Sequence, residues 1–179
     1  MGKPTEPRQV KLFTGLLTSR PKVLEVVEDK LRGEFGPTDL ESGLIPFDFT
    51  DYYREEMGEE IKRKFLSFEK LIYPGDLPEL KLLTNKFEAE LSEHSNVDVP
   101  RPVNIDPGYV GLAKLVLATT KNYSHRIYLR DGIYAEVTLR YKNGDFEPLQ
   151  WTYPDYRSSA YLDFFRRVRS RYCAQLDNS

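Results

Sequence analysis

The sequence lacks the residues and runs on which several protein classes depend. Cys173 is the only cysteine among 179 residues, which excludes an intrachain disulfide and any cysteine-rich zinc or iron–sulfur site. No apolar run reaches the roughly 18 residues of a membrane-spanning helix. Residues 1–6 lack the apolar stretch of a secretory signal. We therefore expect a soluble cytoplasmic protein without a membrane partner.

Two further absences limit the chemistry. No Gly-x-x-x-x-Gly-Lys-Ser/Thr motif occurs, so a P-loop nucleotidase is excluded. The only histidines, His94 and His125, lie far apart with no metal-ligand spacing around either. One acidic cluster is consistent with a solvated segment, which we favour, or with a Mg²⁺ or Ca²⁺ site. Its members are Asp48, Asp51, Glu55, Glu56, Glu59 and Glu60. We assign no metal site, and the sequence identifies no cofactor.

Tyrosine and charge are distributed unevenly along the chain. Three of the 12 tyrosines precede residue 100 and nine follow it. Residues 1–100 carry 14 basic against 20 acidic side chains, and residues 101–179 carry 12 against 8. Either two domains meet near residue 100, or one domain has an acidic side and a basic, tyrosine-rich side. The order of the elements favours a single domain over residues 1–179.

Apolar periodicity predicts the elements of the first 120 residues. In order they are a strand at 9–17, a helix ending near 35, an extended segment at 38–49, a strand at 61–72, a helix at 76–93, a loop at 94–102 and a strand at 111–119. This order is that of a ferredoxin-like βαββαβ sandwich, with two helices on one face of a sheet.

The C-terminal third adds hairpins and a last helix. Asp131-Gly132 and Asn143-Gly144 tolerate the positive φ angles of type I′ turns and predict two tight hairpins. A final helix is expected from about 159 to 175. The predicted fold is α+β: a ferredoxin-like βαββαβ sandwich extended by C-terminal antiparallel β-hairpins and a final helix. Residues 1–8 and 176–179 are expected to be poorly ordered tails.

Two-residue turns also predict which side chains share a face of the hairpins. Leu129 is then opposite Tyr134, and His125 lies diagonally from Glu136 with Trp151 beside it. This half-exposed face presents His, Glu, Thr and Trp together and suits a small ligand. A longer loop would shift the register and redistribute these residues.

Asn104-Ile105-Asp106-Pro107-Gly108-Tyr109 is the most turn-like segment of the chain. Pro107-Gly108 suits the centre of a type II turn. On such a loop Asp106 is a candidate general base or ligand anchor. The alternative is that its carboxylate only accepts backbone N–H bonds within the turn.

Cationic side chains gather near the end of the strand at 111–119. Lys114 interrupts that strand and must reach solvent or a carboxylate, because burying an unpaired ammonium is costly. With Lys121 and Arg126 it provides donors for a phosphate or carboxylate. Histidine is the side chain that most often serves as acid or base near neutral pH, so His125 suits acid or base chemistry. Structural pairing within the sheet explains the same residues equally well.

Trp151-Thr152-Tyr153-Pro154-Asp155-Tyr156 gathers aromatic rings around one proline. The segment can stack a flat ring, or it can connect the sheet rigidly to the last helix. The last helix carries a basic cluster of Arg166, Arg167, Arg169 and Arg171. The sequence pI of about 5.8 disfavours a dedicated nucleic-acid binder without excluding nucleic acid as a partner.

Several short sequences together resemble a known family. They are Gly15-Leu16-Leu17, Phe47-Asp48-Phe49-Thr50-Asp51-Tyr52-Tyr53, Glu56-Met57-Gly58, Asn104-x-Asp106-Pro107-Gly108-Tyr109, His125-Arg126-Ile127-Tyr128-Leu129 and Trp151-Thr152-Tyr153-Pro154-Asp155-Tyr156. The chain resembles the prokaryotic domain of unknown function 4416 family from about Pro4 to Tyr172. The resemblance implies a small stand-alone prokaryotic protein, and it brings no established activity or catalytic residues.

We expect a protein that binds a small anionic ligand, a nucleotide or phosphorylated metabolite, with acid–base hydrolytic chemistry as a further option. The candidate catalytic residues are His125, Asp106 and Glu136. The candidate ligand-binding residues are Asn104, Tyr109, Lys114, Lys121, Arg126, Trp151 and Tyr153. The competing hypothesis is a non-enzymatic module that contacts protein or RNA through the tyrosine-rich sheet extension and the basic C-terminal helix. The sequence leaves the oligomeric state open.

Overall fold

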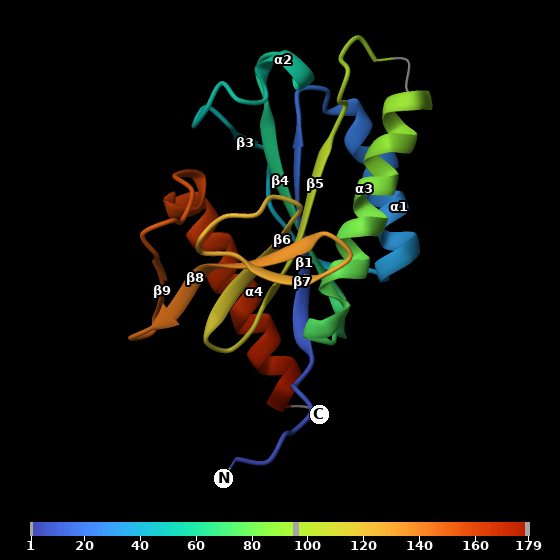
Figure 1. Ribbon diagram of the computed structural model, residues 1–179. Coiled ribbons are helices and arrows are strands. Elements are labelled where there is room, and N and C mark those ends of the chain that lie inside the picture. The colour runs from blue at the N-terminus through green and yellow to red at the C-terminus, as the bar shows by residue number, and fades with distance from the viewer. Residues whose placement is uncertain (1, 95–96, 178–179) are drawn as a thin grey trace.

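The computed structural model describes residues 2–94 and 97–177, and one nine-stranded antiparallel sheet is its centre (Figure 1). The strand order is β2-β4-β1-β5-β6-β8-β7, with β3 paired to β4 and β9 paired to β8. The α+β class and the final helix are confirmed. No helix in the described part of the chain is both long and apolar enough to cross a membrane.

The elements have the following bounds. The strands are β1 (Val10–Thr18), β2 (Thr38–Glu41), β3 (Ile45–Pro46), β4 (Lys62–Ile72), β5 (Asn104–Val110), β6 (Lys114–Thr119), β7 (Ile127–Arg130), β8 (Ile133–Lys142) and β9 (Asp145–Pro148). The helices are α1 (Lys22–Phe35), α2 (Arg54–Met57), α3 (Leu77–His94) and α4 (Ser159–Asp177), with 3-10 turns η1 (Pro74–Asp76) and η2 (Asp155–Arg157).

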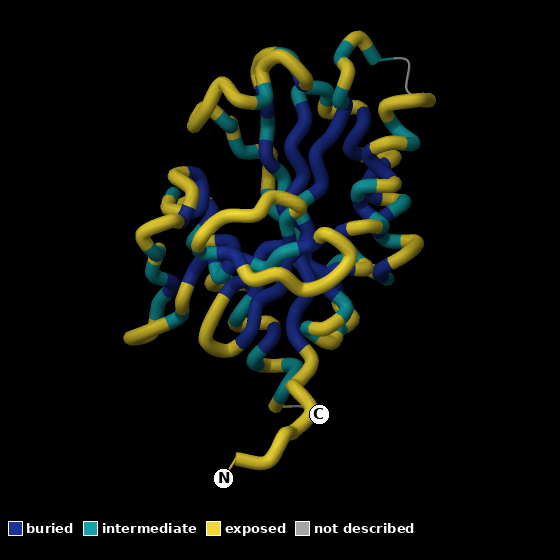
Figure 2. The backbone as a smooth tube through the Cα atoms, in the orientation of Figure 1, coloured by how far each residue is buried: buried dark blue, intermediate teal, exposed yellow. Residues whose placement is uncertain are grey.

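Strand β1 lies inside the sheet, between β4 and β5, and is buried on both faces (Figure 2). Leu12 and Leu16 face one layer, where they belong to a core cluster with apolar residues of α1 and α3. Phe13 faces the other layer and packs edge-on against Phe165 of α4, with 4.8 Å between the ring centroids. The helices α1 and α3 therefore cover one face of the sheet, and α4 covers the other.

Both predicted hairpin turns are present. Asp131, Gly132, Asn143 and Gly144 all have positive φ, and Arg140 pairs with Glu147 across the second turn as predicted. The predicted register of the first hairpin is wrong. Tyr134 is opposite Tyr128, not Leu129, because an irregularity between Tyr128 and Arg130 shifts the pairing by one residue.

The predicted turn at Asn104–Tyr109 is also wrong, because this segment is strand β5. Pro107 pairs with Thr14 of β1, whereas β6 pairs with β5 only at Gly108–Val110. The proline thus lies where β5 has a neighbour on one side only, a position at which a residue without an N–H is tolerated in a sheet. Gly108 is required by close packing, since a Cβ there would lie 2.5 Å from the Val116 carbonyl oxygen.

The predicted tails and loop coincide only in part with the described residues. Residues 1, 178 and 179 lie outside them, as do residues 95–96 of the predicted 94–102 loop. Residues 2–8 are exposed and have no regular secondary structure, whereas residues 176–177 belong to α4.

Candidate functional site

A cavity of about 620 Å³ opens where β5 and β6 part. Beyond their three paired positions the two strands diverge, and within residues 2–94 and 97–177 no other strand pairs with residues 104–107 of β5 on that side. The cavity is lined there by β5, α3 and the end of β6. The segments 47–56, 119–126 and 153–156 contribute its other walls. The site is therefore a gap in the sheet that side chains line.

Helix α3 supplies the hydrogen bonds that a neighbouring strand would have made to β5. Lys81 Nζ donates to the Ile105 carbonyl oxygen at 2.8 Å, and the Ile105 N–H donates to Glu88 Oε1 at 2.7 Å. Buried backbone groups need partners, which explains two charged residues on the buried face of a helix. Burial raises the pKa of Glu88, although Lys81 and Arg101 oppose the shift.

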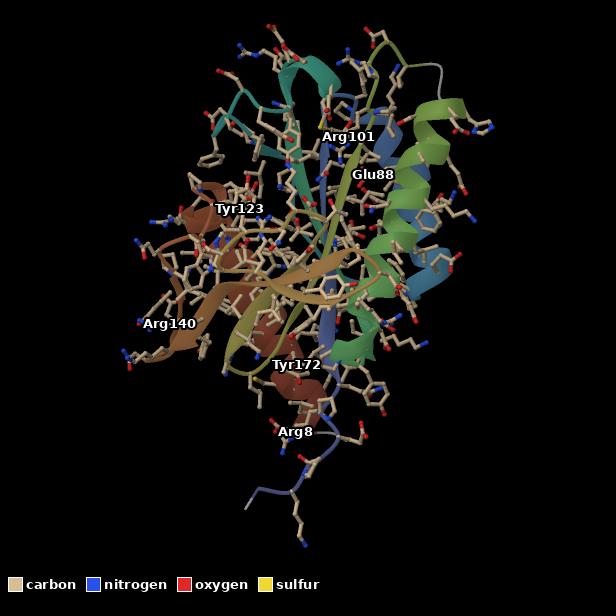
Figure 3. All side chains as sticks on the ribbon, in the orientation of Figure 1. Arg8, Glu88, Arg101, Tyr123, Arg140 and Tyr172 are labelled. Carbon is tan, nitrogen blue, oxygen red and sulfur yellow. The ribbon has the colours of Figure 1, made fainter. Side chains whose placement is uncertain are left out.

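Arg101 links this helix to the cavity (Figure 3). Its Nη2 donates to Glu88 Oε2 at 2.7 Å and also to Asn104 Oδ1. Nη1 donates to Glu56 Oε2 at 3.3 Å. The arginine is thus already engaged by two carboxylates.

Asp106 is the carboxylate that β5 contributes to the cavity lining. Its Oδ2 accepts hydrogen bonds from Asn104 Nδ2 at 2.6 Å and Arg63 Nη1 at 3.3 Å. Oδ1 lies 3.6 Å from Lys81 Nζ, an ion-pair distance too long for a good hydrogen bond. Burial alone would raise the pKa of Asp106, but Lys81 and Arg63 hold it below its usual value. Its carboxylate is therefore ionised and a weak base.

Arg63 lies beneath the cavity and is almost fully buried. Nε donates to the Tyr161 hydroxyl at 3.2 Å, and Nη2 reaches Asp155 Oδ2 at 3.5 Å. Burial raises the pKa of Asp155, against the effect of Arg63. Tyr156 lines the same cavity, and its buried hydroxyl has no hydrogen-bond partner among the described residues. Such a group is costly to leave unpaired.

Besides the pair between Arg63 and Asp106, a second buried ion pair lines the cavity, between Arg126 and Glu136. Arg126 Nε donates to Glu136 Oε2 at 2.8 Å, and its Nη2 donates to the Tyr153 hydroxyl at 2.8 Å. His125 Nε2 lies 3.0 Å from the same Glu136 oxygen. The imidazole stacks against Trp151, with 5.3 Å between the ring centroids, and less closely against Tyr123.

Lys121 differs from the other cations of the lining. Its Nζ donates to the Tyr52 hydroxyl at 2.8 Å and lies 4.3 Å from the centre of the Tyr52 ring. Arg63, Lys81, Arg101 and Arg126 all contact a carboxylate. Within residues 2–94 and 97–177, Lys121 is the lining cation that has no carboxylate partner.

The cavity brings together six of the ten residues predicted for the site: Asn104, Asp106, Lys121, Arg126, Glu136 and Tyr153. The other four lie outside its lining. Tyr109 packs in the core with Val116, and Lys114 is exposed at the start of β6 opposite Arg140. His125 and Trp151 stack behind the Arg126–Glu136 pair. His125 still contacts Glu136, although the register from which that contact was inferred is wrong.

Sequence reasoning missed several residues that line the cavity: Arg63, Lys81, Asn85 and Arg101. A usable signal existed for two of them. Arg63 stands between Lys62 and Lys64 at the start of a predicted strand, where alternation turns it to the opposite face from both. Lys81 falls beside the apolar stripe of α3. In the described part of the chain, no group of three or more His, Cys, Asp or Glu side chains could hold a metal ion.

Comparison with known proteins identifies the family. The family model described as domain of unknown function (DUF4416) matches residues 8–172, and the chain belongs to this family. Neither the curated proteins nor the solved structures contain a match. The resemblance noted in the sequence is thereby confirmed.

Proposed function

We propose that this member of the DUF4416 family binds a small anionic ligand in the cavity between β5 and β6, with nucleotides and phosphorylated metabolites as the first classes to test. The observation that carries the proposal is Lys121, a cation without a carboxylate partner at an aromatic-lined cavity. An ammonium in that position is available to an anion, whereas the arginines are already engaged.

The size and lining of the cavity support a ligand of this kind. About 620 Å³ is within the range of small-molecule sites. Tyr52, Tyr53 and Phe47 line one side, and Tyr123 and Tyr153 come from distant segments. Rings of this kind bury the apolar part of a ligand, while Lys121 and Thr120 offer donors. The proposal concerns binding alone, because His125 lies outside the lining.

A thermal-shift screen tests the proposal with the full chain and a panel of nucleotides and sugar phosphates. We expect at least one anion to raise the melting temperature, and the shift to fall strongly in Lys121→Ala. Lys142→Ala is the matched control, since Lys142 is an exposed lysine at the second hairpin. The proposal fails if no anion stabilises the protein, or if the two variants respond alike.

An interaction module is the second candidate, and the edge strand β7 favours it. Ile127 is 69% exposed and Tyr128 is 57% exposed on a strand with one free edge. The basic helix α4 gives the interaction module less support, because two of its arginines have partners within the protein. Arg166 pairs with Asp145, and Arg169 stacks on Tyr141 at 3.5 Å. Salt-sensitive retention on RNA, with no small-molecule shift, would favour this candidate.

We also propose a ferredoxin-like topology, a single domain and a cytoplasmic location for this protein. The order β2-β4-β1-β5, with α1 and α3 on one face, supports a ferredoxin-like unit over residues 10–110. We treat the chain as one domain of a prokaryotic cytoplasmic protein.

A further inference from the structure

The polar side chains of the cavity gather at two ends, which differ in charge and in hydrogen-bonding capacity. The inner end contains Asp106 and the α3 face that carries Lys81, Asn85 and Glu88. The outer end contains Lys121 with Thr119 and Thr120. The proposed function places an anion in the cavity, and the character of the two ends determines where that anion goes.

The inner end does not suit an anion. Asp106 is an ionised acceptor whose side chain is 26% exposed. The nearby cations are either nearly inaccessible, as Arg63 and Lys81 are, or already paired, as Arg101 is with Glu88. A phosphate placed here would meet a carboxylate before it met a free cation.

Asn85 makes the inner end bipolar. It lies one helical turn beyond Lys81 and three residues before Glu88, both of which contact Ile105, so it faces the same stretch of β5. Asn85 lines the cavity, and its amide makes no hydrogen bond to another described residue. The amide donates and accepts, whereas the Asp106 carboxylate only accepts.

We propose that the inner end binds the edge of a planar ring that carries a hydrogen-bond donor beside an acceptor, and that the ligand bears one anionic group of low charge at Lys121. Asp106 accepts from the donor of the ring, and Asn85 donates to its acceptor. The aromatic walls stack the ring. Nucleobases and other heterocycles with an amide-like edge share this chemistry. The inference rests on the proposed function and specifies its ligand.

The charge of the ligand follows from the available cations. Lys121 is the lining cation without an acidic partner in the described chain, and the accessible Asp106 and Glu56 are negative. A nucleoside monophosphate or a heterocyclic carboxylate matches one free cation. A triphosphate would bring several further charges to a cavity whose described lining has no second unpaired cation.

Calorimetric titration of the full chain tests this inference. The probes are ribonucleosides, their 5′-monophosphates and 5′-triphosphates, a pyrimidine carboxylate, ribose 5-phosphate and inorganic phosphate. We expect a monophosphate or the pyrimidine carboxylate to bind tightest, and which of them does so identifies the source of the ring. Ribose 5-phosphate and inorganic phosphate should bind at least 10-fold more weakly, because a single ion pair at an exposed lysine contributes little by itself.

Two variants separate the two ends of the cavity. Asn85→Asp removes the donor and adds a negative charge, so the affinity for the nucleoside should fall by roughly 10- to 100-fold, and that for the monophosphate by at least as much. Lys121→Ala should lower the affinity for the monophosphate to that of the nucleoside and leave the nucleoside unchanged. Lys86→Ala, on an exposed position of α3, is the control. Asp106→Asn repeats the test of the inner end, provided its unfolding midpoint confirms a folded chain.

Three results would overturn the inference. Ribose 5-phosphate binding as tightly as the nucleotide, with Asn85→Asp harmless, would leave the proposed function standing and remove the ring site. A triphosphate binding more than 10-fold tighter than the monophosphate would contradict the assignment of low charge. Failure of every anion to bind would remove the proposed function as well.

Discussion

Gly15 in β1 lies directly against Arg63 in β4: a methyl group added at Gly15 would come within 2.9 Å of Arg63 Nη1. The same nitrogen donates to Asp106. A side chain at Gly15 would therefore push the guanidinium away from the inner end of the cavity. The missing side chain on one strand allows the buried cation on the next strand to reach β5.

Substitution of the two closely packed glycines should be costly. We expect Gly15→Ala to lower the free energy of unfolding by about 1–3 kcal/mol, as overpacking does. Gly108→Ala should cost about 3 kcal/mol or more, because its Cβ would meet a carbonyl oxygen that cannot move aside. Gly33→Ala in α1 is the control. Nothing lies within 4 Å of its added Cβ, so it should stabilise by about 0.5–1 kcal/mol. Urea denaturation measures the free energy of unfolding of all three variants. Equal losses at Gly15, Gly108 and Gly33 would contradict the close packing of the first two.

Removing the Tyr156 hydroxyl should leave the free protein as stable as before or slightly more stable. Among the described residues that buried hydroxyl has no partner, so Tyr156→Phe loses no hydrogen bond that the structure shows. Tyr161→Phe removes the acceptor of Arg63 Nε and should cost about 1–3 kcal/mol. Thermal and urea unfolding of the two variants give the comparison. A larger loss in Tyr156→Phe than in Tyr161→Phe would show that its hydroxyl is paired in solution.

The pH dependence of stability should include a contribution from Glu41. Burial alone would raise its pKa, but hydrogen bonds from Arg32, Thr38 and Lys64 lower it to about 2 from 4.5. A carboxyl whose pKa is lower in the folded state stabilises above its unfolded pKa, and this contribution is lost as the pH falls toward 2. Glu41→Gln should be less stable than the wild type at pH 6, by about 1 kcal/mol or less for a partly exposed ion pair. The difference should shrink between pH 4.5 and 2. A gap that stays constant over this range would argue against the shift.

A buried ion pair joins β1 to β2 and provides a further test. Lys11 is fully buried and donates to Asp39 and to Gln175 Oε1, the latter at 2.7 Å. Lys11→Met alone leaves Asp39 buried without its closest cation and should cost about 3–5 kcal/mol. The double variant Lys11→Met with Asp39→Leu should recover most of that loss. If the double variant is as unstable as the sum of the singles, the two side chains do not act as a pair.

Local signals in the sequence predicted the local parts of this structure. Asn143-Gly144 specifies its turn, because both residues must adopt positive φ, and the register follows from the turn. In the first hairpin the register differs from the one that its turn predicts, because the pairing shifts between Tyr128 and Arg130. The residue types around Leu129 do not indicate this shift. Pro107-Gly108 is typical of a turn, but Gly108 is required by the close approach of Val116 on the next strand and of Phe13, which is distant in the sequence.

The site was harder to predict than the fold for a related reason. The Asp106 and Lys121 assignments rested on residue type, and both residues line the cavity. Asn85, by contrast, is an ordinary polar helix residue in the sequence. It lines a cavity only because β5 and β6 diverge in the folded structure. Lys81 gains its role only because a backbone carbonyl opposite lacks a strand partner. Such roles depend on tertiary structure, and single-sequence patterns do not contain it.

The two side chains that α3 directs at Ile105 also bear on how separate molecules behave toward each other. A strand with free N–H and C=O groups is a template for pairing with a strand from a second molecule. Lys81 and Glu88 occupy both groups of Ile105, so they protect this edge from intermolecular pairing. The loss of either side chain should therefore be noticed first as aggregation of concentrated protein.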